Sequence, residues 1–342
     1  MPAKPSLAIA AIGLNHFHIF GMSKAMRAAG AELVAFHEPD DELAQPYAQE
    51  FPGAKRVADQ RQILEDSRIQ MVLSAAIPAD RHRIGLAAMR HGKDFMSDKP
   101  GFTALSQLEE VRKVQAETKR IYSICYSERH EVPAAVHAGE LVAAGAIGRV
   151  LQTIGLGPHR LNAPRRKPWF FQPSRNGGAL ADIASHQMDQ FLFFTGSTSA
   201  TVVSSRVGNL AHPEFPEFED FGEAVVTGDG GEGYTRVDWF TPDGLATWGD
   251  GRLTILGTEG FIELRKYVDI AGRPAGNHLF LVDKKETRYI DCTGKPLPYG
   301  SRLVADVQNR TETAMPQVHC FLASELALKA QGQALRIPNK GR

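Results

Sequence analysis

The chain has 342 residues, a length that suggests two domains rather than one. Its 39 basic and 39 acidic side chains give no net charge, which argues against nucleic acid or an anionic membrane surface as the main partner. No segment approaches the run of about 18 apolar residues that a membrane helix needs. The three cysteines are odd in number and match no zinc spacing, so we expect free thiols and a cytoplasmic protein.

The first third of the chain alternates between predicted strands and helices. Apolar runs predict strands at residues 6–12, 32–36, 71–76, 94–97 and 121–126, and helical patterns lie between them at 19–29, 41–50, 79–91 and 106–118. The first run has the size of a signal-peptide core, but polar "NHFH" follows without a cleavage motif, so we interpret it as a buried strand. This alternation predicts an α/β fold, a doubly wound parallel sheet whose ligands bind at the carboxyl ends of the strands.

The turn after the first strand reads "GLNHFH" and retains only the first glycine of the dinucleotide fingerprint G-x-G-x-x-G. Gly13 permits a tight turn, and the backbone amides of residues 15–17 could open a helix N-terminus toward a pyrophosphate. Asn15 tolerates left-handed backbone angles, so it could partly replace the second glycine. Gly21 could supply the close approach of helix and sheet that the third glycine normally allows. An ordinary strand–helix turn is an equally good interpretation of this motif alone.

The end of the second predicted strand carries Glu38, 25 residues after Gly13 and near the spacing of a ribose-binding carboxylate. The surrounding "EPDD" contains no arginine to receive a 2′-phosphate, so NAD is favoured over NADP as the cofactor. The alternative is a solvated loop acid. His16 and His18 form an H-x-H pair, but no carboxylate cluster lies near them in the sequence, so we expect no metal site.

The segment "GGALADIASHQMDQFLFF" at residues 177–194 predicts a buried helix from residue 182, because its apolar side chains spread around more than half of the circumference. Asp182, His186 and Asp189 fall at i, i+4 and i+7 on one stripe of that helix. Burial of carboxylates and an imidazole is costly unless they are paired or used in chemistry. The stripe is therefore a candidate active site, and a structural buried histidine is the alternative.

A basic and aromatic loop at residues 155–171 precedes that helix. His159, Arg160 and Trp169 could line a substrate cleft, where the tryptophan would stack on a sugar and an arginine would hold an anionic group. A solvated loop or an oligomer contact is as good an interpretation. Residues 214–220 are expected to form a surface loop, strands with glycine turns follow, and a last helix is expected near residues 317–330.

Five segments taken together resemble the glucose–fructose oxidoreductase / inositol dehydrogenase family (Gfo/Idh/MocA). They are "GLNHFH", "AAIPADRH" at 75–82, "GKDFMSDKP" at 92–100, "GELVAAGAIGRV" at 139–150 and "GGALADIASHQMDQ" at 177–190. The segment "LTILGTEGFIEL" fits the C-terminal sheet of that family. The most specific parts are the D-K-P triplet, where the family usually has E-K-P, and the D-x-x-x-H pair.

The resemblance implies an NAD(P)-binding Rossmann domain at residues 1–125 and an α+β domain at 126–342. The second domain would bind substrate and form the oligomer with a large, mostly antiparallel open sheet. The implied cofactor-binding residues are Gly13, Asn15, His16, Phe17, Glu38, Ala76, Ile77, Pro78, His82, Asp98 and Lys99. The implied substrate-binding residues are Lys99, His159, Arg160, Trp169, Asp182 and His186, of which Lys99, Asp182 and His186 would be catalytic.

The resemblance implies an NAD-dependent oxidoreductase of carbohydrate metabolism, which transfers a hydride between the nicotinamide and a ring hydroxyl or carbonyl of a sugar, inositol or related polyol. His186 would take the hydroxyl proton, Lys99 would stabilise the developing alkoxide, and Asp182 would orient the imidazole or bind a neighbouring hydroxyl. We expect a carbohydrate substrate and a homodimer or homotetramer.

Two other functions stay open: a redox-neutral NAD-dependent glycoside-cleaving enzyme, and a non-catalytic dinucleotide sensor. The sequence also departs from the family pattern. Asp98 replaces a glutamate, the fingerprint lacks two glycines, and "YSERHEVP" at 126–133 replaces the segment that the family uses for substrate contacts.

Overall fold

We describe a computed structural model of the chain, which covers residues 6–338. The chain divides into two compact units. The first unit runs to Cys125 and also includes Pro298–Phe321, and the second comprises Tyr126–Leu297 together with the chain from Leu322 onward. The change of unit after residue 125 falls where we expected it. The segment from 298 to 321 differs from the expectation, because it belongs with the first unit rather than the second.

The first unit contains a six-stranded parallel sheet in the order β3-β2-β1-β4-β5-β6. Its strands are β1 (Ala8–Ile12), β2 (Glu32–His37), β3 (Lys55–Arg56), β4 (Met71–Ser74), β5 (Asp94–Asp98) and β6 (Tyr122–Cys125). The connecting helices are α1 (His18–Ala28), α2 (Asp41–Glu50), α3 (Arg61–Leu64), α4 (Pro78–Arg90) and α5 (Leu105–Thr118). The predicted parallel sheet is therefore confirmed, and among these strands and connecting helices only β3 and α3 were not expected.

Local sequence signals explain most of these boundaries. The side chain of Asp40 accepts a hydrogen bond from the Glu42 N–H at 2.9 Å and caps α2. Pro78 opens α4, where its missing N–H costs nothing. Every residue of β4, β5 and β6 is buried, as expected for parallel strands that helices cover on both faces.

A late segment of the chain completes the core of the first unit. Helix α11 (Tyr299–Asn309) contributes Tyr299, Leu303 and Val307 to the same buried cluster as Ile9 of β1. The hydroxyl oxygens of Ser123 and Tyr299 lie 2.7 Å apart. This packing explains why the segment belongs with the parallel sheet.

The second unit is built on a nine-stranded sheet in the order β14-β13-β12-β11-β7-β10-β9-β8-β15. Its strands are β7 (Val150–Pro158), β8 (Ala200–Gly208), β9 (Phe221–Gly228), β10 (Glu232–Asp238), β11 (Arg252–Gly257), β12 (Gly260–Arg265), β13 (His278–Asp283), β14 (Thr287–Asp291) and β15 (Leu335–Arg336). Most neighbours are antiparallel, and β7–β10 and β8–β15 are parallel pairs. The predicted large, mostly antiparallel sheet is confirmed.

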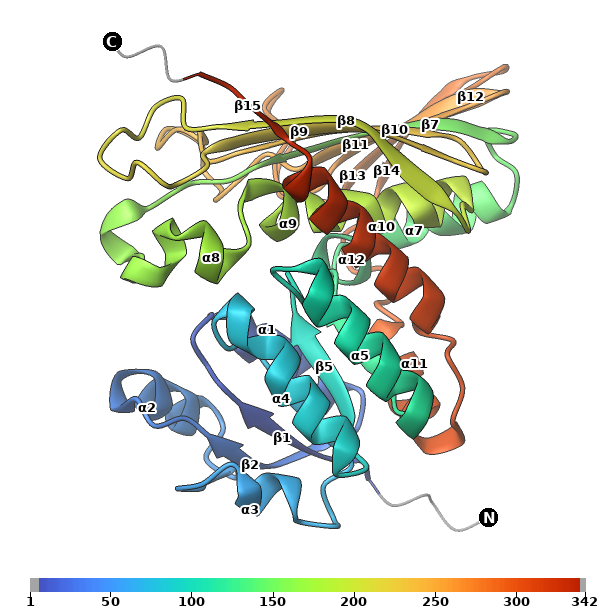
Figure 1. The fold of residues 1–342 in the computed structure, drawn as a ribbon. Helices are drawn as coiled ribbons and strands as arrows, with labels where there is room; N and C mark the ends of the chain where they lie inside the picture. Colours follow the sequence, from blue (N-terminus) through green and yellow to red (C-terminus); the bar gives the residue numbers. More distant parts are fainter. Residues whose placement is uncertain (1–5, 339–342) are drawn as a thin grey trace. The chain divides into compact units, whose positions relative to one another are not determined.

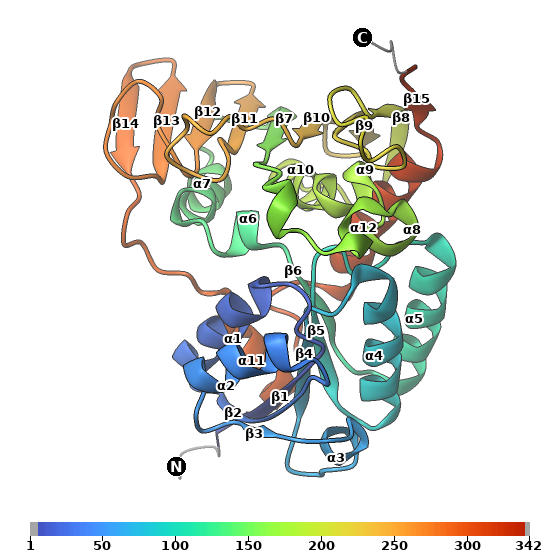
Figure 2. The ribbon, with the colours of Figure 1, turned by 90° about the vertical axis from the view of Figure 1, so that its left-hand side faces the viewer.

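Helices cover one face of this sheet. Figures 1 and 2 show α7 (Pro133–Ala143), α9 (Ala179–Asp182) and α10 (Ala184–Thr195) on that face. Among the residues that the structure describes, no helix lies on the other face. The remaining helices are α6 (Ser127–His130), η1 (Ala163–Arg165), η2 (Pro168–Phe171), α8 (Pro173–Asn176) and α12 (Gln317–Gly332). The sheet is therefore open on one side, as the resemblance implied.

Helix α10 lies unusually close to the sheet. A Cβ atom added to Gly155 on β7 would lie 2.6 Å from Cγ of Gln187, and one added to Gly157 would lie 3.1 Å from Cγ2 of Ile183. The two glycines therefore allow this close packing. The helix was expected to be continuous from residue 182, but Asp182 ends α9 and His186 lies in the first turn of α10. The expected stripe thus spans two helices.

The expected surface loop at residues 214–220 is wrong at its end, where Glu219 and Asp220 are buried. The carboxylate of Asp220 accepts hydrogen bonds from the backbone N–H groups of Leu210 at 2.7 Å and Ala211 at 2.8 Å. None of the helices in the described part of the chain has both the length and the apolar character needed to cross a membrane.

Candidate functional site

In the first unit, the residues predicted to bind a cofactor follow the carboxyl ends of four parallel strands. Gly13 follows β1, Glu38 follows β2, residues 76–78 follow β4, and Asp98 ends β5. Gly13 has a φ of +76°, and an added Cβ would lie 2.6 Å from Cβ of Ala76. Only glycine fits this turn, so the expected role of Gly13 in the turn is confirmed.

The Glu38 carboxylate is buried rather than solvated, which removes the alternative of a loop acid. It accepts hydrogen bonds from the Leu14 N–H at 2.8 Å and the Asp40 N–H at 3.0 Å. These contacts fix the carboxylate beside the glycine turn. A carboxylate has four acceptor positions, so two remain for hydroxyl donors of a ligand. A cavity of about 300 Å³ adjoins it, lined by His37, Glu38, Pro39, Arg56, Val57 and Ala58.

Arg56 corrects the expectation that no arginine lies near Glu38. It belongs to the two-residue strand β3, and its Nη2 donates to the carbonyl oxygen of Glu38 at 2.8 Å. Its Nη1 lies 2.6 Å from Oδ1 of Asp41. The guanidinium is therefore engaged by the loop that carries Glu38. This contact could not be predicted from the sequence, because the two residues of β3 are too few to show a strand pattern.

Asp98 is the centre of a buried polar cluster. Its carboxylate lies 3.1 Å from Nη2 of Arg81, 2.9 Å from Nδ1 of His18 and 3.3 Å from Nδ1 of His16. Burial alone would raise the pKa of Asp98, but the charges of His18 and Arg81 and the hydrogen bonds to both histidines hold it well below its usual range. Burial, followed by the charge of His18, lowers the pKa of His16 to about 3, so this imidazole is neutral.

The two departures from the family pattern meet in this cluster. His18 occupies the position of the third fingerprint glycine, and its ring contacts Asp98, which replaces the family glutamate. Two expectations about the turn are wrong. A Cβ on Gly21 would meet no atom of the described chain within 4 Å, so Gly21 supplies no close approach. Asn15, although well within the described residues, does not adopt a left-handed conformation.

His16, His18 and Asp98 also form the group that could hold a metal ion within the described residues, with ligand atoms less than 4.8 Å apart. The sequence shows no carboxylate cluster near the H-x-H pair, but the fold brings one distant carboxylate, that of Asp98, to both histidines. However, Arg81 already neutralises the Asp98 carboxylate, and the Lys99 N–H occupies its Oδ1 at 2.8 Å. The donor set favours a hydrogen-bonded cluster over a cation site.

The other predicted residues of the first unit lie on the same strand ends or next to them. Ile77 precedes α4 and Pro78 opens it, while His82 is buried within that helix. Phe17 is 65% exposed beside the two histidine rings. Lys99 is buried directly after Asp98.

In the second unit, the segment "YSERHEVP" forms α6 and contributes a buried ion pair that the sequence analysis did not assign. Nε and Nη2 of Arg129 donate to the two carboxylate oxygens of Asp189 at 2.6 and 2.7 Å. Asp189 is fully buried on α10. This bidentate pair ties α6 to α10, so the third residue of the expected stripe has a structural partner.

A second buried pair joins α6 to the end of β12. Nζ of Lys266 lies 2.6 Å from Oε2 of Glu128, and both side chains are buried. Burial would raise the pKa of Glu128, but the charges of Lys266, His186 and His159, in that order, bring it down to about 2. The predicted residues His186 and His159 therefore both lie within the field of an ionised carboxylate that the sequence did not reveal.

Asp182 and His186 are both buried in the second unit. Burial lowers the pKa of Arg166, and the charge of Asp182 opposes this effect, so these two groups attract each other. The Arg166 guanidinium also lies over the rings of Phe170 at 4.3 Å and Trp239 at 5.2 Å. Arg166 is thus used inside the unit.

Arg160 is likewise engaged by its own unit. Its Nη2 donates to the carbonyl oxygens of Pro242 at 2.8 Å and Leu245 at 2.6 Å. This arginine therefore fixes the loop after β10 rather than offering its charge to a ligand. His159 lies between two tryptophans, with ring centroids 5.2 Å from Trp239 and 4.5 Å from Trp248.

The predicted aromatic residue Trp169 packs edge-on against Phe170 at 6.0 Å and is partly exposed. Trp248 was not predicted, although it is 44% exposed beside His159. An isolated tryptophan in a loop carries no periodic signal that would have identified it.

Comparison with known proteins identifies the class of this chain. Residues 7–126 match the model of the oxidoreductase family with an NAD-binding Rossmann fold, and residues 135–263 match the Gfo/Idh/MocA C-terminal domain. The chain belongs to the Gfo/Idh/MocA oxidoreductase family.

The similar proteins include sugar and polyol dehydrogenases. The chain is 31% identical to levoglucosan dehydrogenase of Pseudarthrobacter phenanthrenivorans over 57% of this chain and 50% of that protein. It is 26% identical to inositol 2-dehydrogenase of Acidothermus cellulolyticus over 63% of this chain and 61% of that protein. The chain thus spans about half of the length of the curated relatives it matches.

A crystal structure from Erwinia carotovora atroseptica SCRI1043, of a protein named only as an oxidoreductase, shares 46% identity and a TM-score of 0.95 with this chain. The alignment covers 97% of this chain and 100% of that one. More distant structures of the same fold hold NADH in one case and NADP in another. The matched family has an NAD-binding Rossmann fold, and structures of this fold hold either cofactor.

Proposed function

We propose that this chain is an NAD-dependent oxidoreductase that transfers a hydride between the nicotinamide and a ring hydroxyl or carbonyl of a neutral sugar or polyol. The observation that carries the proposal is the Glu38 carboxylate, held by the Leu14 N–H beside the Gly13 turn. The turn at Gly13, where a Cβ atom would not fit, suits the pyrophosphate of a dinucleotide. The Glu38 carboxylate has acceptor positions left and adjoins a cavity, which suits the ribose.

The residues of both units would share the chemistry. When bound, the nicotinamide accepts or returns the hydride. The backbone around Gly13 would hold the pyrophosphate, and Glu38 would accept hydrogen bonds from ribose hydroxyls. His186 would take the proton of the substrate hydroxyl, because an imidazole titrates near the working pH. Lys99 would stabilise the developing alkoxide, and Asp182 would orient the imidazole or bind a neighbouring hydroxyl.

The charges of the second unit favour a neutral substrate. Arg160 is bound to backbone carbonyls, and Arg166 is covered by aromatic rings beside Asp182. The ammonium group of Lys266 is likewise paired with the Glu128 carboxylate, so it is not available to bind an anion. A polyol with several hydroxyl donors suits carboxylate acceptors and an exposed Trp248, which could stack on a sugar face. The names of the related levoglucosan and inositol dehydrogenases support this class of substrate.

One assay separates this function from its alternatives. Purified protein would be incubated with NAD and a panel of sugars, inositols and aryl glycosides, while NADH absorbance and aglycone release are both followed. NADH formation without aglycone release supports the dehydrogenase. Aglycone release without net NADH supports the glycoside-cleaving alternative. NAD binding with no turnover of any compound would favour the non-catalytic sensor.

NAD should bind more tightly than NADP. Glu38 would repel a 2′-phosphate, and the one arginine of that cavity, Arg56, is already paired with Asp41. Calorimetric titration with both cofactors measures the difference. Glu38→Ala should narrow the gap by removing the repulsion, and Asp41→Asn should narrow it by releasing Arg56. Tighter binding of NADP by the unmodified protein would contradict the assignment.

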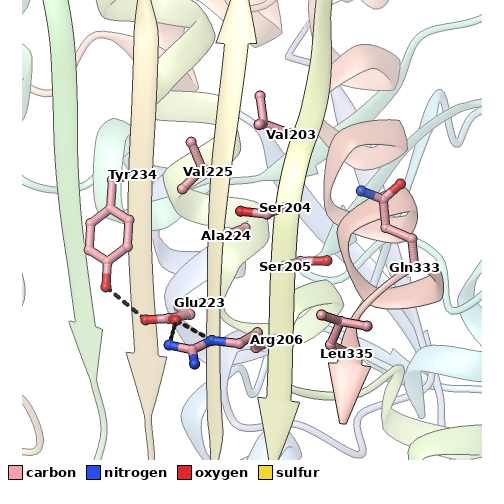
Figure 3. Close-up of a pocket in the computed structure, with 10 residues that line it drawn as sticks. All are labelled: Val203, Ser204, Ser205, Arg206, Glu223, Ala224, Val225, Tyr234, Gln333 and Leu335. Atoms are coloured by element: carbon pink, nitrogen blue, oxygen red, sulfur yellow. Dashed lines mark hydrogen bonds and ion pairs between the residues drawn. The ribbon is translucent and has the colours of Figure 1, made fainter. Parts of the chain in front are cut away.

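The chain should form a homodimer or homotetramer through the open face of its nine-stranded sheet. A cavity of about 300 Å³ lies against β8, β9 and β10, and one of its lining residues, Val203, is 60% exposed. Figure 3 shows the side chains that line it, where Arg206 and Tyr234 both donate hydrogen bonds to the Glu223 carboxylate. Exposed apolar side chains on such a face are usually covered by a partner. Light scattering at micromolar concentration should report a dimer or larger. Val203→Asp should weaken the assembly, whereas Val318→Asp, at an exposed position of α12, should not. A monomeric native protein would refute this arrangement.

A further inference from the structure

A closed set of buried hydrogen bonds surrounds the helical turn that carries His186. Nζ of Lys266 donates to Oε2 of Glu128 at 2.6 Å and to Oε1 of Gln190 at 2.7 Å. Nε2 of Gln190 donates in turn to the backbone carbonyl of His186 at 2.9 Å. Nε2 of Gln187 donates to Oε2 of Glu128 at 3.2 Å. The backbone carbonyl of His186 and the side chain of the next residue, Gln187, are therefore both tied to one ion pair.

Stability alone does not explain this ion pair. The side chains of Lys266 and Glu128 are 1% and 2% exposed, so both charges have lost their hydration. Replacement of such a pair by apolar side chains is often neutral or stabilising. Moreover, Oε1 of Glu128 is buried and has no hydrogen-bond partner among the described residues. A buried carboxylate oxygen that accepts no hydrogen bond lowers the stability of the fold, so the pair is poorly suited to a purely structural role.

The electrostatic surroundings of Glu128 indicate that its carboxylate interacts with His186. Burial would raise the pKa of Glu128, but the charge of Lys266 and then those of His186 and His159 hold it at about 2, so the carboxylate is ionised at neutral pH. An anion close to an imidazole stabilises the protonated ring. The cation of Lys266 limits that stabilisation. The pair can therefore set the proton affinity of the imidazole.

We propose that Glu128 and Lys266 are positioning residues that orient His186 and hold its proton affinity at the value that the reaction needs. The inference rests on the proposed function, in which His186 exchanges a proton with the substrate. Neither residue needs to touch the substrate. Glu128 acts through its charge. Lys266 acts through its charge and also through Gln190, whose side chain donates a hydrogen bond to the backbone carbonyl of His186.

Other charged groups pack around this network, and their arrangement is compatible with the proposal. Arg129 and Asp189 neutralise each other in a bidentate pair that joins the same two helices. Tyr267 stays uncharged, because burial, followed by the charges of Glu128 and Glu131, keeps its pKa well above the usual range. Besides the Arg129–Asp189 pair and the uncharged Tyr267, the network thus contains the Glu128–Lys266 ion pair and the imidazoles of His159 and His186.

The proposal is tested by the protonation midpoint of His186, measured by NMR titration of protein labelled with ¹⁵N-histidine. The His186 signal is assigned by its loss in His186→Asn. Glu128→Gln removes the anion and should lower the midpoint by about one pH unit, since an opposite charge at close range shifts a pKa by about 1–3 units. Lys266→Met removes the cation and should raise the midpoint. The double variant should lie between the single ones.

Gln190→Leu is the matched control, because it removes the hydrogen bond to the backbone carbonyl of His186 without changing a charge. It should leave the midpoint within about 0.3 units of the unmodified protein, a small fraction of the shift expected from a neighbouring charge. A midpoint that does not move in Glu128→Gln, or that moves the same way in Glu128→Gln and Lys266→Met, would overturn the proposal. Melting temperatures of all variants identify any that fail to fold, and Glu128→Asp, which keeps the charge, then replaces Glu128→Gln and should preserve the midpoint.

The same variants separate this inference from the proposed function. With an active sugar from the substrate panel, the acid limb of kcat for alcohol oxidation should follow the midpoint, moving to lower pH in Glu128→Gln and to higher pH in Lys266→Met. If His186→Ala turned over at the native rate, the proposed function would fail. If His186→Ala were inactive but the midpoint did not respond to Glu128, only the positioning role would fail.

Discussion

His186→Ala should lower turnover by roughly 10²–10⁴-fold, the usual contribution of general acid–base catalysis. The residue is buried in the first turn of α10, and its charge is among those that act on the ionised carboxylate of Glu128. NAD affinity should change little, because Gly13 and Glu38 belong to the other unit. Turnover, NAD affinity and melting temperature would be measured on one preparation of the variant.

Lys99→Ala should lower turnover by a similar factor. The double variant with His186→Ala should lose less turnover than the product of the two single losses, since the effects of residues that act together are not additive. Asp182→Asn preserves shape and should give a smaller loss if Asp182 only orients the ring. A purely structural His186 predicts a different result, a lower melting temperature with native turnover per folded molecule. That outcome would mean that the active site lies elsewhere.

Arg81→Met should destabilise the first unit by about 3–5 kcal/mol, the usual cost of removing one partner of a buried ion pair. Arg81 is 1% exposed on α4. Its guanidinium bonds the Asp98 carboxylate and donates to the carbonyl oxygens of Ala76 at 2.7 Å and Pro100 at 3.0 Å. Without it, an ionised carboxylate and several carbonyl groups would be left in the interior. The free energy of unfolding from urea titration measures the loss.

Arg83→Met is the control for this effect, because Arg83 lies two residues further along the same helix and is exposed. That substitution should change the free energy of unfolding by less than about 0.5 kcal/mol. NAD affinity should also fall in Arg81→Met, since the segments that follow β4 and β5 lose their common anchor. If Arg81→Met lowered the free energy of unfolding by less than about 1 kcal/mol, Asp98 would have taken up a proton or found another partner with little loss of stability.

Most of the first unit could be predicted because its signals are local. Helix α2 has the predicted bounds, since an aspartate cap and an acidic first turn mark its start. Continuous apolar runs marked the buried strands β4 and β6. The break at Ile183 between α9 and α10 could not be predicted, because the apolar pattern continues through it. Strand β3 was missed because two polar residues show no alternation.

Residues of the candidate site could be predicted where they belong to a sequence motif. They could not be predicted where their role depends on a partner that is distant in the sequence. Gly13, Glu38 and Lys99 were identified from spacing and resemblance. Glu128 and Lys266 are 138 residues apart, and neither lies in a pattern that suggests the other. The pairing depends on α6 and the end of β12 meeting in the folded unit, and such pairs cannot be inferred from local sequence signals.

The division of the chain has a consequence for its synthesis. The parallel sheet is finished by residue 125, but α11, which covers part of its core, belongs to the segment that starts at Pro298. About 170 residues of the other unit are translated in between, which takes roughly 10–30 s at ribosomal speeds. During this interval the apolar side chains that later contact Leu303 and Val307 remain uncovered. We therefore expect the first unit to complete its core only after the segment that begins at Pro298 has been translated.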